Sequence, residues 1–170
     1  EMCIRDSIHG TQLEKDIKTY SFFDYSVNEA LHMSEEEHDI VVAILKRIRL
    51  EVENPNDDFQ NEILVGYISL LLKYCQRFYQ RQFVTRKHAN NDILSRFDSF
   101  LNGYFADNLQ LDRGLPTVGI CAEHLCMSTN YFSDLIKKMT GESPGRHIRQ
   151  FIIRQIKNEL ASGLTVAEVA

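Results

Sequence analysis

The stretch TVGICAEHLCMSTNYFSDLIKKMTG, residues 117–141, decides the fold of this chain. Its opening TVGICA nearly recurs at residues 165–170 as TVAEVA, and each copy predicts the start of a helix. The first copy continues through a short turn at Met127 and Ser128 into a second helix, Ser128 to Thr140, which Gly141 ends. Two helices joined by so short a turn are typical of a helix-turn-helix. The second copy reaches only Ala170, so we expect a second such unit that is incomplete in this chain.

The residue types within this stretch agree with that prediction. The first helix must cross closely beneath the second, which requires a small residue at the crossing, and Ala122 is there. Apolar residues that would seat both helices on a preceding helix are Cys121, Leu125, Met127, Phe132 and Leu135. Ser128 is a suitable cap for the second helix, which leaves the first turn of that helix free to approach a DNA groove.

The outer face of this second helix carries side chains that can recognise bases. The candidate base-contacting residues are Thr129, Asn130, Ser133 and Asp134. In the major groove Asn pairs with adenine, Ser and Thr with several bases, and Asp with the cytosine amino group. The candidate phosphate-contacting residues are Ser128, Lys137, Lys138, Arg146 and Arg149.

Charge is distributed unevenly along the chain. The formal net charge is −5, which by itself disfavours a nucleic-acid partner. Residues 1–92, however, carry 11 basic and 16 acidic side chains, whereas residues 128–157 carry 6 basic and 2 acidic side chains, a local net charge of +4. Phosphate binding needs a basic face rather than a basic protein. The candidate contacts therefore lie in the basic part of the sequence.

Composition places the chain among soluble proteins. Hydrophobic residues make up 44% and charged residues 25% of the sequence, as in globular proteins. No apolar run approaches the roughly 20 residues of a membrane span. The four cysteines lie within apolar patterns, which indicates reduced thiols. We therefore expect a cytoplasmic protein without membrane association.

The acidic part of the sequence predicts a strand followed by a helical pair. The aromatic segment YSFFDYSV, residues 20–27, favours a strand, with residues 3–9 as its only candidate partner. Since a lone strand is unstable, we expect residues 1–33 to be the remnant of a sheet domain. Ser34 and Glu37 form a capping box at the start of the next helix, and a longer helix is predicted over residues 59–83.

The longer helix carries two adjoining apolar stripes. One contains Phe59, Ile63, Tyr67, Leu70, Leu71, Tyr74 and Phe78, and the other contains Leu64, Ile68, Leu72, Cys75 and Tyr79. A helix this widely apolar needs more than one neighbour. Two interpretations remain open: a two-sided core contact within the chain, or a dimer interface between two copies.

Further helices are predicted around residues 117–141. The polar residues 81–92 indicate a linker, and apolar spacing predicts a lead helix from Ile93, followed by a loop over residues 107–116. Ser143 and Pro144 begin another helix, whose expected buried stripe is Ile148, Ile152, Ile156 and Leu160. Gly163 ends that helix, after which Thr165 and Glu168 form a second capping box.

The run LPTVGICAEHLCMSTNYFSDLIKKMTGESPGRHIRQFIIRQIKNELASGLTVAEVA, residues 115–170, resembles the AraC/XylS family of transcription regulators. The resemblance covers about residues 93–170, and its most specific part is NYFSDLIKKMTGESP, residues 130–144, followed by a linker helix. Upstream, FFDYSVNEALHMSEEE, residues 22–37, resembles the end of the sensor domain in one subgroup of this family.

The resemblance implies a fold and a mechanism. The family has two helix-turn-helix units joined by a linker helix, dimerising helices, and a cupin-like sensor domain that binds a small-molecule effector. By position, Asn130, Ser133 and Asp134 match the base-facing sites of the family, although Asp134 departs from the common Arg or Gln.

The expected fold is mainly α, with a short β remnant near the N-terminus and an AraC-type, homeodomain-like helix-turn-helix domain whose second unit is incomplete. The expected divisions are a sensor remnant (1–33), a dimerising helical pair (34–84), a linker (85–92) and a DNA-binding domain (93–170).

Metal and catalytic alternatives have little support in the sequence. Two E-x-x-H pairs, Glu29 with His32 and Glu35 with His38, lie on one continuous segment rather than on facing helices. Zinc binding by Cys121, His124 and Cys126 lacks a fourth ligand at the usual spacing. No nucleophile elbow or phosphate loop occurs. We therefore expect no enzyme activity, no catalytic residue, no metal and no cofactor.

The functional prediction is a sequence-specific DNA-binding transcription regulator. Its expected partners are the major groove of double-stranded DNA, a second copy in a homodimer and a small-molecule effector, with RNA polymerase as a further candidate. The alternative is a helical interaction or dimerisation module that does not read DNA. Effector, operator, and activation versus repression are not encoded in any pattern of this sequence.

Overall fold

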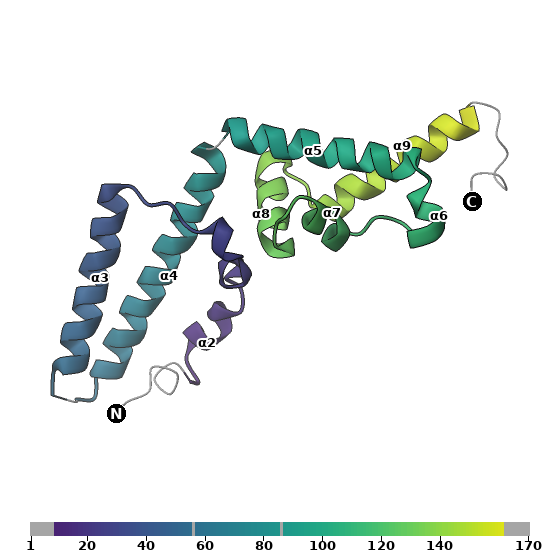
Figure 1. The fold of residues 1–170 in the computed structure, drawn as a ribbon. Coiled ribbons are helices and arrows are strands. Elements are labelled where there is room, and N and C mark those ends of the chain that lie inside the picture. The colour runs from purple at the N-terminus through teal and green to yellow at the C-terminus, as the bar shows by residue number, and fades with distance from the viewer. Residues whose placement is uncertain (1–8, 56, 86, 162–170) are drawn as a thin grey trace. The chain divides into compact units, whose positions relative to one another are not determined.

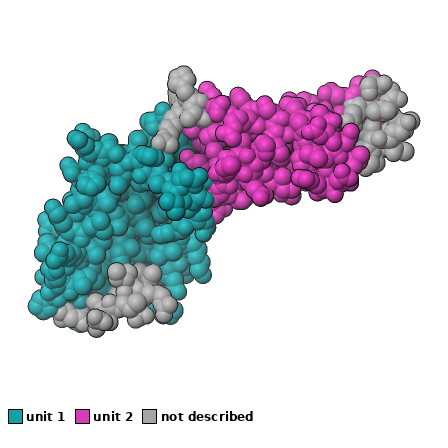
Figure 2. All heavy atoms as spheres, in the orientation of Figure 1, with its two compact units in different colours: residues 1–85 teal, residues 86–170 magenta. Residues whose placement is uncertain are grey.

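The computed structural model describes residues 9–55, 57–85 and 87–161 of the chain (Figure 1). These residues form helices and connecting turns, with no strand among them, as a mainly α fold predicts. The chain divides into two compact units, residues 1–85 and residues 86–170, coloured separately in Figure 2. The repeat at residues 165–170, its capping box, Gly163 and most of the segment 3–9 lie outside the described residues.

The prediction of a strand over residues 20–27 is wrong. The N-terminal segment contains α2 (Gln12–Ile17) and two 3₁₀ helices, η1 (Ser21–Asp24) and η2 (Val27–Glu29). Its aromatic side chains pack on a helix instead of entering a sheet: the ring centroids of Phe22 and Tyr25 lie 5.7 and 5.1 Å from that of Tyr79. A capping box between Ser26 and Glu29 fixes the second 3₁₀ turn.

Unit 1 is built on a hairpin of two long helices, α3 (Glu35–Glu53) and α4 (Gln60–Thr85), which pack side by side (Figure 1). The predicted capping box at Ser34 is confirmed, because the Ser34 Oγ accepts from the Glu37 N–H and the Glu37 carboxylate accepts from the Ser34 N–H. The turn is fixed by buried Gln60, whose amide donates to the carbonyls of Glu51 and Asn54.

Unit 2 begins with α5 (Lys87–Ala106), and two predictions need correction there. Residues 87–92 belong to this helix, so the polar segment predicted as a linker is its first turns. Polar composition misled the prediction because polar residues also occur within helices, and one of these residues, Asn90, is buried. The predicted loop over residues 107–116 contains a short helix, α6 (Leu109–Arg113), which starts after Asn108 in a left-handed conformation.

Three more helices complete unit 2: α7 (Val118–His124), α8 (Thr129–Thr140) and α9 (Pro144–Ala161). They pack with α5 around one apolar core, whose buried members are Phe97, Leu101, Cys121, Ala122, Leu125, Phe132, Ile136, Ile148 and Phe151. Aromatic edges link the layers, since the Phe97 ring meets Phe132 edge-on with centroids 5.0 Å apart.

The apolar stripe predicted for α9 is buried only in its first half. Ile148 is buried and Ile152 packs against the core, but Ile156 and Leu160 are exposed. No helix in the described part of the chain is long and apolar enough to span a membrane.

Candidate nucleic-acid interface

The turn between α7 and α8 sets the geometry of the candidate interface. Ala122 is almost fully buried at this point, as predicted for the helix crossing, and its carbonyl accepts from the Met127 N–H at 2.9 Å. The chain reverses at Cys126, which adopts a left-handed backbone with φ 57°. The turn, predicted at Met127 and Ser128, begins earlier, because α7 ends at His124. A positive φ at a non-glycine residue has no clear sequence signal.

Helix α8 begins and ends at the predicted residues. The Ser128 Oγ accepts from the Tyr131 N–H at 3.2 Å and so caps the first turn. At the other end Gly141 takes φ 79°, and its N–H donates to the Lys137 carbonyl at 2.9 Å. Both capping predictions are confirmed, and the helix is therefore held at each end by local hydrogen bonds.

The two faces of α8 differ sharply. Its inner face, made of Tyr131, Phe132, Leu135 and Ile136, is buried in unit 2. Opposite that face lie the four predicted base-contacting residues: Thr129 is exposed, and Asn130, Ser133 and Asp134 are half-buried. The spacing of three and four residues between them puts these side chains next to one another on the helix. The structure thus brings the four predicted residues together on one face of a single rigid helix.

Lys137 and Lys138 continue this helix toward its C-terminal end. Both are exposed and lie in the last turn of α8, where cations interact favourably with the helix dipole. Neither lysine forms an ion pair with any residue in the described ranges. Their positive charge is therefore available to an anion from solvent.

The two predicted arginines lie on α9 and differ from each other. Arg149 is exposed and makes no ion pair within the described part of the chain. Arg146 is already engaged, because its Nε lies 3.4 Å from Glu142 Oε1, and the other oxygen of Glu142 accepts from Gln150 at 3.0 Å. The sequence analysis did not identify Glu142 as a partner of Arg146. Its spacing of four residues from Arg146 within a helix could have predicted the ion pair.

The first turn of α9 is tied to α5 by a contact that the sequence did not suggest. His147 Nε2 lies 2.7 Å from Asp98 Oδ1, and the imidazole ring packs on Phe97 with centroids 5.0 Å apart. This pair joins residues 49 positions apart in sequence. It holds Arg146 and Arg149 in place relative to the core that carries α8.

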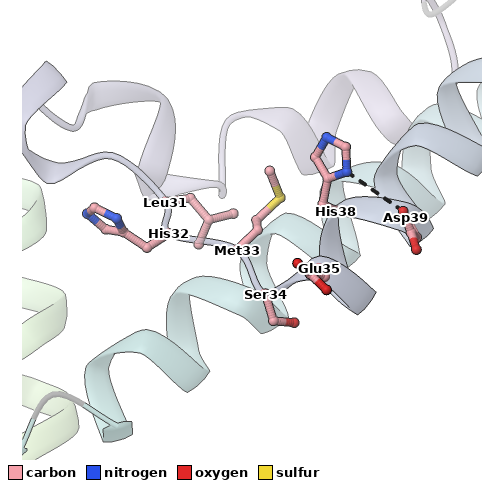
Figure 3. Close-up of a pocket in the computed structure, with 7 residues that line it drawn as sticks. All are labelled: Leu31, His32, Met33, Ser34, Glu35, His38 and Asp39. Atoms are coloured by element: carbon pink, nitrogen blue, oxygen red, sulfur yellow. Dashed lines mark ion pairs between the residues drawn. The ribbon is translucent and has the colours of Figure 1, made fainter.

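The E-x-x-H pairs do not form a binding site. Glu29 is used in a capping box, and Glu35 lies in the first turn of α3. Figure 3 shows the shallow hollow lined by residues 31–35, 38 and 39, where His32 and His38 point away from each other and His38 faces Asp39, 3.8 Å away. Among the described residues no group of three or more candidate ligands is close enough to hold a metal ion.

Of the two cysteines considered for a zinc site, Cys121 is in surroundings that disfavour its thiolate. Burial raises the pKa of the Cys121 thiol to about 11, because the thiolate would lose its solvation. Since the thiolate is the form that binds metal or attacks an electrophile, Cys121 is suited to packing. This fits its predicted place among the apolar residues that seat both helices on the preceding helix.

No protein-family model matches this chain, and neither a curated protein nor a solved structure is significantly similar to it.

Proposed function

We propose that this chain is a sequence-specific DNA-binding transcription regulator of the AraC/XylS type. In this proposal α7 and α8 form a helix-turn-helix, and α8 enters the major groove with Thr129, Asn130, Ser133 and Asp134 toward the bases. Ser128, Lys137, Lys138, Arg146 and Arg149 contact phosphates. The protein acts in the cytoplasm and catalyses no reaction.

The observation that carries the proposal is the division of α8 into two faces. One face is completely buried, so the helix is held rigidly, while the other presents short polar side chains and then two lysines. A recognition helix needs this combination, because base contacts require fixed side-chain positions and phosphate contacts require nearby cations. Asn130 has the chemistry for a bidentate contact with adenine.

Unit 1 is proposed to supply homodimerisation. The hairpin of α3 and α4 leaves large apolar side chains in contact with water, among them Leu45, Val52, Phe59, Ile63 and Leu70. These residues come from both helices, and Ile63 and Leu70 are seven positions apart on α4, the repeat of a helix–helix seam. A second copy, which offers the same surface, would bury them in an isologous contact.

The same exposed surface supports the second candidate function, a helical interaction module that does not read DNA. Both functions use the hairpin of α3 and α4 for association, and they differ in whether α8 binds DNA. In the regulator a small-molecule effector and RNA polymerase are further proposed partners, whereas the interaction module requires neither.

Salt dependence of DNA binding distinguishes the two functions. If Lys137, Lys138, Arg146 and Arg149 all neutralise phosphates, the logarithm of the binding constant should fall with the logarithm of salt concentration with a slope of about −3 to −4 per chain. The measurement is fluorescence anisotropy with a labelled duplex between about 50 and 200 mM salt. Absence of DNA binding at the lowest salt, with self-association retained, would favour the interaction module.

A further inference from the structure

A groove of about 520 Å³ in unit 2 is lined by residues of α5, α6 and α7. Its α5 residues repeat at helical spacing along one side of the helix: Arg96, Ser99, Phe100, Gly103, Tyr104 and, just beyond the helix end, Asp107. Leu109 and Arg113 of α6 and His124 of α7 complete the lining. From Arg96 to Asp107 the groove follows the helix for about 16 Å, or three turns.

The walls of the groove are fixed by contacts within unit 2. The imidazole of His124 stacks on Phe100 with centroids 4.2 Å apart, which joins the end of α7 to α5. The Tyr104 hydroxyl donates to the Gly114 carbonyl at 2.9 Å and so ties the loop after α6 to α5. A groove held in this way is preformed, so a ligand would meet little ordering cost.

Gly103 keeps the floor of the groove open. A glycine inside a helix costs roughly 0.5–1 kcal/mol relative to alanine. At Gly103 an added Cβ would meet no atom within 4 Å, so neither close packing nor a positive φ requires glycine there. The structure shows open space next to Gly103, which is one of the residues that line the groove.

The charge of the groove is positive. Arg96 and Arg113 are exposed, and neither forms an ion pair with any residue that the structure describes. Asp107 is the single acidic side chain among the lining residues. Because the guanidinium groups belong to α5 and to the end of α6, they stand at separate places along the groove.

Two leucines that are close in sequence to the α6 lining residues are exposed. Leu111 is 78% exposed and Leu115 is 57% exposed, both within a few residues of lining residues Leu109 and Arg113. A pocket for a small molecule encloses most of its ligand, whereas this groove is open along its length. A long groove with an apolar floor is the geometry that receives an amphipathic helix.

We propose that this groove binds an acidic amphipathic helix from a partner protein. Apolar side chains of that helix occupy the space above Gly103, against Phe100 and Leu109, and its carboxylates pair with Arg96 and Arg113. This proposal rests on the proposed function in one respect: the partner helix would bind a regulator that is bound to DNA. In Figure 1 α6 lies at the opposite end of unit 2 from α8, so a helix docked there leaves the candidate base contacts free.

The test uses the full chain and a labelled peptide of about 15 residues, long enough to cover the groove as a helix. The peptide carries leucine and phenylalanine at helical spacing and glutamate elsewhere; a second peptide replaces each glutamate by lysine. Fluorescence anisotropy should show binding of the acidic peptide and not of the basic one. Gly103→Phe, which fills the groove, should weaken acidic-peptide binding about tenfold or more, as should the charge reversal Arg96→Glu with Arg113→Glu.

Gly103→Ala is the matched control, because it raises helix propensity and adds only one methyl group. It should stay folded and keep most of the peptide affinity, and circular dichroism should show that Gly103→Phe keeps its helices. Equal binding of both peptides, no binding of the acidic one, or unchanged affinity in the filled variant would overturn the proposal. A change in oligomeric state on Gly103→Phe would instead identify a second copy as the occupant and would also overturn it.

Binding of the wild-type chain to duplex DNA is measured in the same samples. Peptide binding without any DNA binding would contradict the proposed function alone, whereas DNA binding without peptide binding would contradict the groove alone.

Discussion

The two units of the chain differ in how completely they bury their own apolar side chains. In unit 2 the helices α5, α7, α8 and α9 enclose a continuous core, and Phe97, Leu101 and Phe132 are inaccessible to solvent. In unit 1 Ile44 is the one buried residue of α3, Leu70 of α4 is 44% exposed, and Phe59, just before α4, is 67% exposed. Among the described residues, unit 2 therefore encloses a larger buried apolar core than unit 1, which leaves more of its large apolar side chains exposed.

Under the proposed function the two units have different roles: unit 2 binds DNA and unit 1 forms the dimer. A surface that reads DNA must be rigid in the monomer, because base contacts depend on fixed side-chain positions. A surface that forms a dimer can remain incomplete until the partner arrives. We therefore expect mutations in the core of unit 2 to act on folding, and mutations on the hairpin of unit 1 to act on association.

The largest expected effect is on the core of unit 2. Phe132→Ala should destabilise this unit by about 3–5 kcal/mol, because the ring is fully buried and packs edge-on against Phe97. Val27→Ala in unit 1 is the control and should change stability by less than about 0.5 kcal/mol, because Val27 is 95% exposed and lies outside the proposed dimer surface. Urea unfolding with hydrogen exchange resolved by unit is the measurement. Equal losses from the two substitutions would remove the contrast between the units.

The next effect concerns self-association. Leu70→Glu places a charge on the exposed apolar side of α4 and should weaken the dimer about tenfold or more, which is roughly 1.4 kcal/mol or more. Gln76→Glu makes the same change in charge at an exposed polar position on the same helix and should have a much smaller effect. Sedimentation equilibrium gives both dimerisation constants. A wild-type chain that stays monomeric at every concentration would refute the role assigned to unit 1.

A smaller effect is expected at the candidate base contacts. Asn130→Ala should cost about 1–3 kcal/mol on the preferred duplex and relax specificity at one base pair. Lys138→Ala is the comparison, because a phosphate contact should weaken binding to all duplexes alike and reduce the salt slope by about 1. Competition binding against duplexes changed at single positions separates the two patterns. If both variants lose affinity uniformly, Asn130 does not face a base.

The smallest effect is expected at Glu142. Glu142→Gln removes the carboxylate that pairs with Arg146 and keeps an oxygen that can accept from Gln150. DNA binding should tighten by less than about 1 kcal/mol, the usual range for a partly exposed ion pair. Asp112→Asn on α6 removes an equal charge at a position distant in sequence from Arg146. It serves as the control in the same titration. Weaker DNA binding of Glu142→Gln would mean that the pair positions Arg146 rather than restraining it.

The local signals in the sequence predicted most of unit 2 correctly. Ser128, Gly141 and Ser143 act where helix-capping rules place them, because caps depend on a few neighbouring residues. Ala122 and Cys121 are buried as predicted, since close helix crossings tolerate only small side chains. The four candidate base contacts lie on one face of α8 because they are spaced three and four residues apart, which is the same periodicity that makes the helix amphipathic.

The errors arose where distant contacts decide the conformation. Residues 20–27 alternate like a strand, but Tyr79, far along the chain, receives their aromatic rings and the backbone forms 3₁₀ turns. Cys126 takes a left-handed backbone conformation because the turn between α7 and α8 requires it, and a cysteine in the sequence does not predict that conformation. The pairing of His147 with Asp98 also depends on how α9 crosses α5, which single-sequence periodicity does not specify.

The central claim is that α8 reads DNA sequence, and selection of binding sites from random duplexes tests it most directly. The wild-type chain should enrich a short motif with preferred bases at adjacent positions, as expected for one recognition helix in a major groove. A selected pool that remains indistinguishable from its random input, even at low salt, would contradict the account.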